Sequence, residues 1–303
     1  MKKILLAIVL VNLQVLAFEY GLTPVKVNES IYCYFGKPEI MNKENNGNMV
    51  NSCFVDMGTS WLVIDSGPSY MYAKEALLHV NKIKKMPVKF VINTHIHDDH
   101  WLGNGYFASH GATIIGSMLF KKEIHSDETP RMAHRISSEA YANTVPTIPS
   151  RFVSKDENLD IASLHVKLIN VDYKAHTNGD LLVYIPKIKT LFVGDLLFND
   201  RLPSLRDGDI NGWLKALEMI KTMNTRTLIG GHGDITNKKA LDLTYEYLTK
   251  LREKVRKALE EEKDISEALE SITMKEYEDT ALFDVMHKQN VEVAYRMLEW
   301  ESE

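Results

Sequence analysis

"NTHIHDDHWLGN", residues 93–104, places three histidines and two aspartates in six consecutive positions of a chain with only 11 histidines. His95 and His97 are two residues apart, so their side chains point the same way on an extended backbone. Two imidazoles at that spacing can bind one metal ion at about 2.0–2.1 Å. Asp99 and His100 follow at the turn into an expected helix and can face a second ion. This loop can therefore hold two ions if other segments complete their coordination.

The residues before this loop predict a strand, a helix and a second strand. The apolar run Leu62–Ile64 stops at Asp65 and is typical of a buried strand that enters a turn. Residues 73–85 have helical periodicity, and residues 88–94 form a second apolar strand that ends at the histidine loop. One face of the expected helix carries Ala76, Leu77, Val80 and Ile83. This order indicates an α/β fold.

Similar elements are expected further along the chain. Residues 164–171 alternate like a strand, and residues 181–186 and 190–197 form an expected hairpin. A helix precedes the strand of residues 226–234. The inward face of this helix is expected to carry Trp213, Leu214, Leu217 and Ile220.

Ligand-type residues recur where these apolar runs end. Asp65, the His95 loop, Asp195 and His232 each follow a predicted strand, and His176 lies in the loop after another. Glycine or asparagine flanks His176, Asp195 and His232, which allows tight backbone turns near an ion. Because sites in layered α/β folds gather at strand ends, we expect these residues to meet at one edge.

The chain is expected to divide into a globular domain and a helical C-terminal extension. The domain covers residues 18–236 and the extension residues 237–303. Helical spacing in the extension is kept by Leu241, Tyr245, Leu248, Val255 and Leu259. This apolar face either packs on the domain or pairs with a second subunit, so a homodimer is one of two open interpretations.

Residues 1–17 have the pattern of a secretory signal peptide. Lys2 and Lys3 precede an apolar run from Ile4 to Leu16, and small residues allow cleavage before Phe18. The apolar run is short for a membrane span, which needs about 20 residues. We therefore expect a periplasmic protein with no membrane partner after cleavage.

The overall composition is that of an ordinary globular protein. Of its 303 residues, 45% are hydrophobic and 25% are charged, which is sufficient for a full core. The formal net charge of −5 argues against a nucleic-acid partner, because such binding depends on phosphate neutralisation by cations.

The two cysteines lie in neighbouring strand-like segments. Cys33 and Cys53 flank the polar, glycine-containing residues 42–48. An oxidising compartment would permit a disulfide between them, and two buried thiols are the alternative.

At the histidine loop the sequence resembles the metallo-β-lactamase superfamily. The motif HxHxDH is followed in order by HTNGD, GD and GGHGD, and the resemblance covers Val25 to Ile235. It implies an αββα sandwich of four layers, in which two mixed sheets pack face to face with helices outside. The metals would lie at one edge of the sandwich.

The resemblance also implies a ligand set for two ions. It assigns His95, His97 and His176 to the first ion, Asp99, His100 and His232 to the second, and Asp195 to both. Asp65 matches an aspartate that supports the ligand loops through hydrogen bonds. Asp98 occupies the variable position of the motif and is not expected to bind metal.

Two Zn²⁺ ions suit these imidazoles and carboxylates, and iron or manganese would fit the same donors. The resemblance implies a hydroxide bridging the ions, because metal-bound water has a pKa of about 7. Asp99 would orient that hydroxide as the catalytic residue. The expected reaction is hydrolysis of an ester, thioester, lactone or amide bond in a small molecule.

The motifs define less narrowly which members of the superfamily this sequence resembles most. Zinc β-lactamases generally carry cysteine or serine where Asp195 stands, so Asp195 favours other hydrolases. Residues 201–220 and 286–301 resemble periplasmic members associated with quinoprotein or sulfur-oxidation relays. The alternatives are a β-lactamase similar to the third subclass, which His100 favours, a mononuclear iron persulfide dioxygenase, and a non-enzymatic metal-binding accessory of a redox relay.

Two further hypotheses concern the substrate. Arg201 and Tyr173 lie near predicted ligand loops and could anchor a substrate carboxylate or an oxyanion. The polar residues 121–135, which include His125 and His134, could form a lid or substrate loop.

Overall fold

The first of two mixed β-sheets is built from the N-terminal half of the chain. In this computed structural model, residues 18–124, 130–161 and 164–301 are described. The first sheet has seven strands in sequence order, antiparallel from β1 to β4 and parallel from β4 to β7. Its strands are β1 (Val25–Asn28), β2 (Ile31–Tyr34), β3 (Ser52–Asp56), β4 (Trp61–Ile64), β5 (Val88–Ile92), β6 (Thr113–Ser117) and β7 (Arg151–Val153).

The second sheet has five strands in the order β12-β11-β10-β9-β8. It is antiparallel except for the β11–β12 pair, which is parallel. Its strands are β8 (Glu157–Ile161), β9 (Leu164–Asn170), β10 (Leu181–Ile185), β11 (Thr190–Phe192) and β12 (Thr227–Ile229). The hairpin expected at residues 181–197 is β10–β11.

The two sheets pack face to face through one hydrophobic cluster. Val55 and Leu62 of the first sheet share it with Val166, Val183 and Phe192 of the second, and all five are buried. Because alternate residues of a strand point to opposite faces, the other face of each sheet must be covered by other elements.

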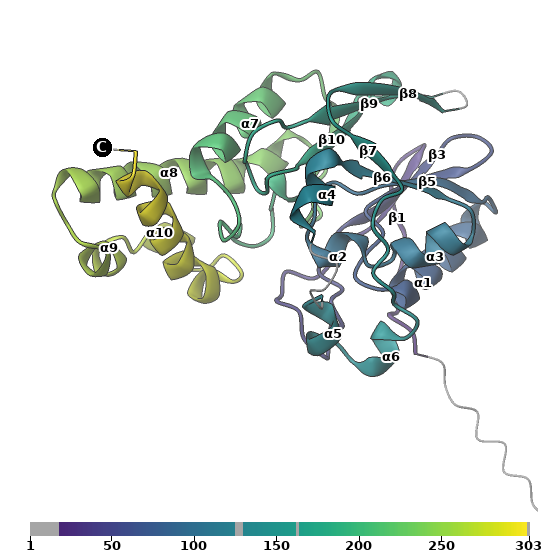
Figure 1. The fold of residues 1–303 in the computed structure, drawn as a ribbon, viewed down its shortest axis with the longest axis horizontal. Coiled ribbons are helices and arrows are strands. Elements are labelled where there is room, and N and C mark those ends of the chain that lie inside the picture. The colour runs from purple at the N-terminus through teal and green to yellow at the C-terminus, as the bar shows by residue number, and fades with distance from the viewer. Residues whose placement is uncertain (1–17, 125–129, 162–163, 302–303) are drawn as a thin grey trace, which may run out of the picture.

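Helices cover the outer face of the first sheet, where α1 (Tyr70–Ile83) and α3 (Asn104–Ser109) lie (Figure 1). The Ser69 side chain caps α1 by accepting a hydrogen bond from the Tyr72 amide. Ala76 and Val80 point inward as expected, whereas Ile83 is 49% exposed. The expectation for Ile83 was wrong: it is the last residue of α1, where the helix ends. Four short helices lie between the strands of this half: α2 (Asp98–Trp101), α4 (Met118–Glu123), α5 (Met132–Arg135) and α6 (Ser138–Tyr141).

The outer face of the second sheet is covered by α7 (Ile210–Thr222), with Trp213, Leu214, Leu217 and Ile220 buried as predicted. The four layers confirm the αββα sandwich. The short 3₁₀ segments of the chain are Pro186–Ile188, Gly194–Leu196, Lys238–Leu241 and Lys275–Tyr277.

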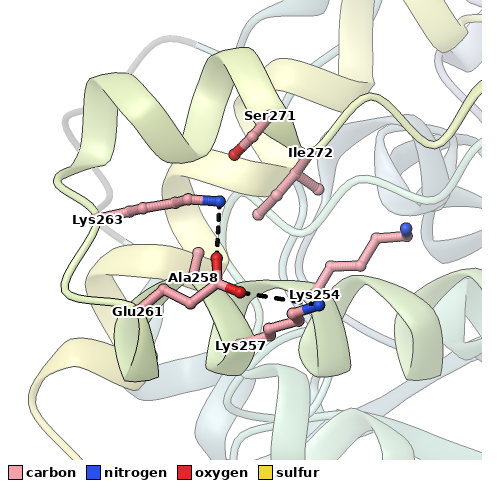
Figure 2. Close-up of a pocket in the computed structure, with 7 residues that line it drawn as sticks. All are labelled: Lys254, Lys257, Ala258, Glu261, Lys263, Ser271 and Ile272. Carbon is pink, nitrogen blue, oxygen red and sulfur yellow. Dashed lines mark ion pairs between the residues drawn. The ribbon is translucent and has the colours of Figure 1, made fainter.

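The C-terminal extension consists of α8 (Asp242–Glu260), α9 (Ile265–Ser271) and α10 (Phe283–Glu299). Helix α8 packs on α7, and α10 packs on α8 and α9, so the extension continues the hydrophobic cluster outside the second sheet (Figure 1). A shallow surface pocket lies between the end of α8 and α9, where Glu261 forms ion pairs with Lys257 and Lys263 (Figure 2). Among the helices of the described residues, none is long and apolar enough to span a membrane.

The structure joins Cys33 and Cys53 in a disulfide, which the sequence left open. The two residues lie directly opposite each other in the β2–β3 register, so the pleat brings their side chains together between the sheets. The predicted signal peptide and His125 lie outside the described residues.

Candidate metal centre

Loops at one edge of the two sheets bring the seven predicted ligands together. His95 and His97 follow β5, and Asp99 and His100 lie in α2 directly after them. The other three follow strands of the second sheet. His176 lies between β9 and β10, Asp195 in the 3₁₀ turn after β11, and His232 after β12.

The first group of donor atoms contains three imidazoles and one carboxylate. The Nδ1 atom of His97 lies 3.1 Å from Nε2 of His95 and 3.0 Å from Nε2 of His176. The Oδ2 atom of Asp195 lies 3.7 Å and 3.4 Å from the same two Nε2 atoms. These four residues form one group whose donor atoms lie within 4.8 Å of one another.

The second group contains Asp99, His100 and His232 and meets the first at Asp195. The Oδ2 atom of Asp99 lies 3.6 Å from Nε2 of His100 and 3.8 Å from Nε2 of His232. Asp195 presents Oδ1 to His100 at 3.0 Å and Oδ2 to His232 at 3.3 Å. Its carboxylate therefore lies between the two groups.

These separations fit metal coordination. Ligand atoms about 2.0–2.1 Å from a tetrahedral ion lie about 3.3 Å from one another, and the observed distances bracket that value. His100 Nε2 and Asp195 Oδ1 are buried and 3.0 Å apart but are not aligned for a hydrogen bond, and neither has another partner among the described residues. Buried polar atoms without partners are rare, so their common orientation is what a bound cation would require.

Burial and neighbouring charges set the protonation of the donors. Burial lowers the pKa of His95 and of His176, which favours the neutral imidazole that binds metal. Burial raises the pKa of Asp99, but His100 and Arg131 outweigh it and bring the pKa to about 2. Asp195 keeps a pKa well below its usual range, because His232 and His100 outweigh the effect of burial. Both carboxylates are therefore ionised at neutral pH.

Asp65 supports the ligands from behind, as the sequence predicted. Its Oδ2 atom lies 2.9 Å from Nδ1 of His100 and accepts a hydrogen bond from the Thr94 hydroxyl at 2.8 Å. Its Oδ1 atom accepts a hydrogen bond from the Thr94 amide. Asp65 has a φ of 56°, a left-handed conformation that aspartate tolerates better than most residues. This turn directs the carboxylate toward α2.

Three other supporting contacts were not predicted from the sequence. His97 Nε2 lies 3.0 Å from Oδ2 of Asp207, His232 Nδ1 lies 2.5 Å from the Met49 carbonyl oxygen, and His95 Nδ1 lies 3.0 Å from the Thr94 hydroxyl. Such partners fix the orientation and tautomer of a ligating histidine. Met49 and Asp207 are more than 100 residues from the histidines they contact, and no motif marked them.

Asp98 belongs to neither donor group and binds Arg131. Its Oδ1 atom accepts hydrogen bonds from Nε and Nη2 of Arg131 at 2.9 Å and 2.5 Å, and its Oδ2 atom accepts one from the Met132 amide. Asp98 thus holds the start of α5 against the site.

Glycine is required beside Asp195. A Cβ atom at Gly231 would collide with the Asp195 carboxylate and with Gly194. This close approach explains the glycine before His232 in the GGHGD motif.

A pocket of about 270 Å³ opens onto the donor atoms, and we call it the metal-edge pocket. Its lining combines metal-centre residues, arginines and large apolar side chains. Besides His97, Asp99, His176 and Asp195, it is lined by Ile40, Met41, Met49, Arg131, Arg135, Phe198, Arg201, Ser204, Arg206 and Met286. Met286 belongs to α10, so the C-terminal extension contributes to the pocket.

The structure supports one of the two predicted substrate anchors. Arg201 lines the metal-edge pocket, whereas Tyr173 lies outside it with the Lys215 ammonium 3.9 Å from its ring centre. The expectation for Tyr173 was wrong because its ring packs beside α7. Neither donor group includes His110, His134, His165 or His287. No other group of this kind exists in the part of the chain that the structure describes.

Comparisons with known proteins agree with this architecture. Residues 45–232 match the family described as the metallo-beta-lactamase superfamily. A "Metallo-beta-lactamase type 2" of Elizabethkingia meningoseptica is 25% identical over 67% of this chain and 77% of its own length. A "Beta-lactamase-like protein 2 homolog" of Caenorhabditis elegans is 21% identical over 76% of this chain and 71% of its own length.

Among solved structures, a metallo-beta-lactamase from Pontibacter korlensis superposes with a TM-score of 0.60 at 21% identity, covering 75% of this chain and 99% of its own. At that identity the superposition supports the fold alone. The family match covers more than half of the chain, and the residues it spans include all seven donors. This chain therefore belongs to the metallo-beta-lactamase superfamily of metallohydrolases.

Proposed function

We propose that this protein is a dizinc hydrolase that cleaves an ester, thioester, lactone or amide bond in a small molecule. The position of Asp195 carries the proposal, because its carboxylate lies between two compact groups of donors. Five imidazoles and two carboxylates suit zinc, and the same set would accept iron or manganese. Divalent ions bound there would supply Lewis acidity and an activated water near neutral pH.

The residues of the chain have distinct roles in this hydrolysis. Asp99 faces the metal-edge pocket and is ionised, so it can accept a hydrogen bond from the attacking water and orient it. Arg131 donates a hydrogen bond to Oδ1 of Asp99 at 3.3 Å. The other oxygen of Asp99, Oδ2, is the one that faces His232 in the second donor group. Phe198 and Met286 give the pocket apolar lining, which would limit the access of other water to the reacting bond.

A periplasmic location is part of the proposal. The N-terminal lysines and the apolar run that follows them favour export. The Cys33–Cys53 disulfide is also typical of a protein that folds in an oxidising compartment. Expression of the full chain in a bacterium, followed by fractionation and N-terminal sequencing, should yield periplasmic protein that begins at Phe18.

Metal content and hydrolysis should be measured on one preparation of the native protein. We expect two zinc ions per chain and turnover of at least one substrate in a panel of esters, thioesters, lactones and amides. The His95→Ala variant should lose bound metal and turnover together, whereas the exposed His110→Ala variant should match the wild type. One iron per chain with sulfur-dioxygenase activity, or metal without any hydrolysis, would contradict the proposal.

β-Lactam hydrolysis is the second candidate function. The 25% identical relative named as a metallo-beta-lactamase favours it, and the carboxylate of Asp195 between the two donor groups disfavours it. Nitrocefin belongs in the same panel. A kcat/KM for nitrocefin far above that for every ester and thioester would make β-lactamase activity the main function.

A further inference from the structure

The metal-edge pocket contains a buried arginine, Arg201, that is not in a direct ion pair with any carboxylate of the described residues. Arg201 is only 5% exposed and is one of the residues that line the pocket. Its Nη2 atom lies 3.2 Å from Nε2 of His232, and its Nη1 atom lies 3.5 Å from the Glu39 carbonyl oxygen. Its Nε atom has no hydrogen-bond partner in the part of the chain that the structure describes. Among the described residues, no carboxylate forms an ion pair with it. The charges of Asp195, Asp99 and Asp200 act on it from a greater distance and only partly offset the lowering of its pKa by burial.

The contact with His232 is not available when that histidine binds a metal. Nε2 is the atom of His232 that faces Asp99 and Asp195 in the donor groups. A metal ion bound to Nε2 of His232 would use the lone pair that otherwise accepts a hydrogen bond from Arg201. Of its contacts with described residues, the guanidinium would then keep the long one to the Glu39 carbonyl oxygen and the one to the face of the Phe198 ring, 5.1 Å from the ring centre.

Such an arrangement is costly without an anion. Arginine remains charged in proteins, and a buried charge that lacks a partner destabilises the fold. Arg131 in the same pocket provides a contrast, because Asp98 accepts two of its hydrogen bonds. The unused donors of Arg201 are therefore the part of the pocket most suited to binding a carboxylate.

The remaining lining restricts the rest of the ligand. Arg135 and Arg206 also line the pocket, and Arg206 is paired with Asp207. Met41, Met49 and Met286 provide flexible apolar contacts. A volume of about 270 Å³ admits a small molecule and excludes a folded macromolecule.

We propose that the substrate is a small amphipathic acid derivative whose free carboxylate is bound by Arg201 beside the bond that is hydrolysed. This inference rests on the proposed hydrolase function and adds the substrate class to it. Arg201 selects the substrate by charge, and the methionines and Phe198 pack against its apolar part.

A matched pair of esters tests the selection. Mono(4-nitrophenyl) glutarate and 4-nitrophenyl valerate differ by a carboxylate in place of a methyl group, and their rates are corrected for uncatalysed hydrolysis. The wild type should prefer the glutarate. In Arg201→Gln this preference should fall about 10-fold to 100-fold, as expected for the loss of hydrogen bonds between charged groups, while turnover of the valerate changes little.

Two variants complete the kinetic test, with the metal content of each one measured. Arg201→Lys keeps the charge but loses the planar fork, so its preference should be intermediate. Arg226→Gln removes an exposed arginine outside the pocket and should match the wild type. If Arg201→Gln does not fold, Arg201→Lys decides, and an unchanged preference overturns the proposal. Equal loss of activity toward both esters would also overturn it, because Arg201 would then act on the reacting atoms.

A binding measurement gives a second readout that is independent of turnover. Benzenesulfonate is a weak ligand for divalent ions but a good partner for guanidinium, and methyl phenyl sulfone is its neutral counterpart. Calorimetry should show that the wild type binds benzenesulfonate more tightly, and that Arg201→Gln removes the difference. Arg201-dependent sulfonate binding without any hydrolysis would refute the proposed hydrolase but support the anion site. Hydrolysis that is insensitive to substrate charge would refute the anion site alone.

Discussion

The Oδ2 atom of Asp65 lies 2.9 Å from Nδ1 of His100, and both side chains are buried. This contact joins the end of β4 to α2 and leaves Nε2 of His100 directed at Asp195. Burial lowers the pKa of His100, but Asp195, Asp65 and Asp99 outweigh it and raise the pKa. The orientation of one metal donor therefore depends on a carboxylate that does not itself belong to either donor group.

Replacing Asp65 by asparagine should weaken metal binding about 10-fold to 100-fold, because the carboxylate orients His100 and increases its basicity. Competition with a chromophoric chelator measures the change, and circular dichroism checks the fold. Asp56→Asn is the matched control, since Asp56 also ends a strand but pairs with Lys84 on the surface. Equal affinities in the two variants would show that Asp65 does not position the ligand.

Asp98 and Asp99 are adjacent but should respond differently to the same substitution. Asp99→Asn removes a donor of the second group, so one of two bound ions should be lost. Asp98→Asn removes a partner of Arg131 and should leave the metal content unchanged. Metal analysis of both variants by mass spectrometry checks this difference, and loss of an ion from Asp98→Asn would contradict the assignment.

Local patterns predicted much of this molecule. The alternation of β9, the helical periodicity of α7 and the spacing of His95, His97 and Asp99 depend on neighbours in the sequence. The ends of the predicted strands also indicated that the ligand loops meet at one edge, because sites in layered α/β folds gather at strand ends. The strands β6, β7 and β8 were not predicted from the sequence.

Contacts between distant segments could not be predicted in the same way. Asp207 meets His97 across 110 residues, and Asn290 meets Pro203 across 87. Neither contact leaves a periodic signal, because each depends on how loops pack after the sheets have formed. The pairing of Cys33 and Cys53 depended on the register of β2 and β3, which a shift of one residue would have changed.

Loss of the disulfide should lower the free energy of unfolding by about 3 kcal/mol, as the chain-entropy argument gives for a loop of about 20 residues. The sequence separation of Cys33 and Cys53 is 20 residues. Urea unfolding of the Cys33→Ala/Cys53→Ala variant measures the loss. Reductant should destabilise the wild type by a similar amount and leave the variant unaffected, and a reductant effect on the variant would point to another cause.

The C-terminal extension holds the loop that carries Arg201 into the pocket. Asn290 of α10 is buried, donates a hydrogen bond to the Pro203 carbonyl oxygen at 2.8 Å and accepts one from the Leu205 amide at 2.9 Å. Backbone pairing of Arg201 with Ala281 and a hydrogen bond from the Leu202 amide to the Ala281 carbonyl oxygen secure the start of the same loop. Asn290 therefore acts as a positioning residue.

Asn290→Ala should leave the Leu205 amide and the Pro203 carbonyl without partners, at a cost of about 1–3 kcal/mol in the free energy of unfolding. Because the loosened loop carries Arg201, KM for mono(4-nitrophenyl) glutarate should rise more than kcat falls, while metal content stays constant. Gln289→Ala removes an exposed amide from the same helix and should change neither quantity. A variant that is destabilised but keeps its KM would show that α10 stabilises the fold without shaping the pocket.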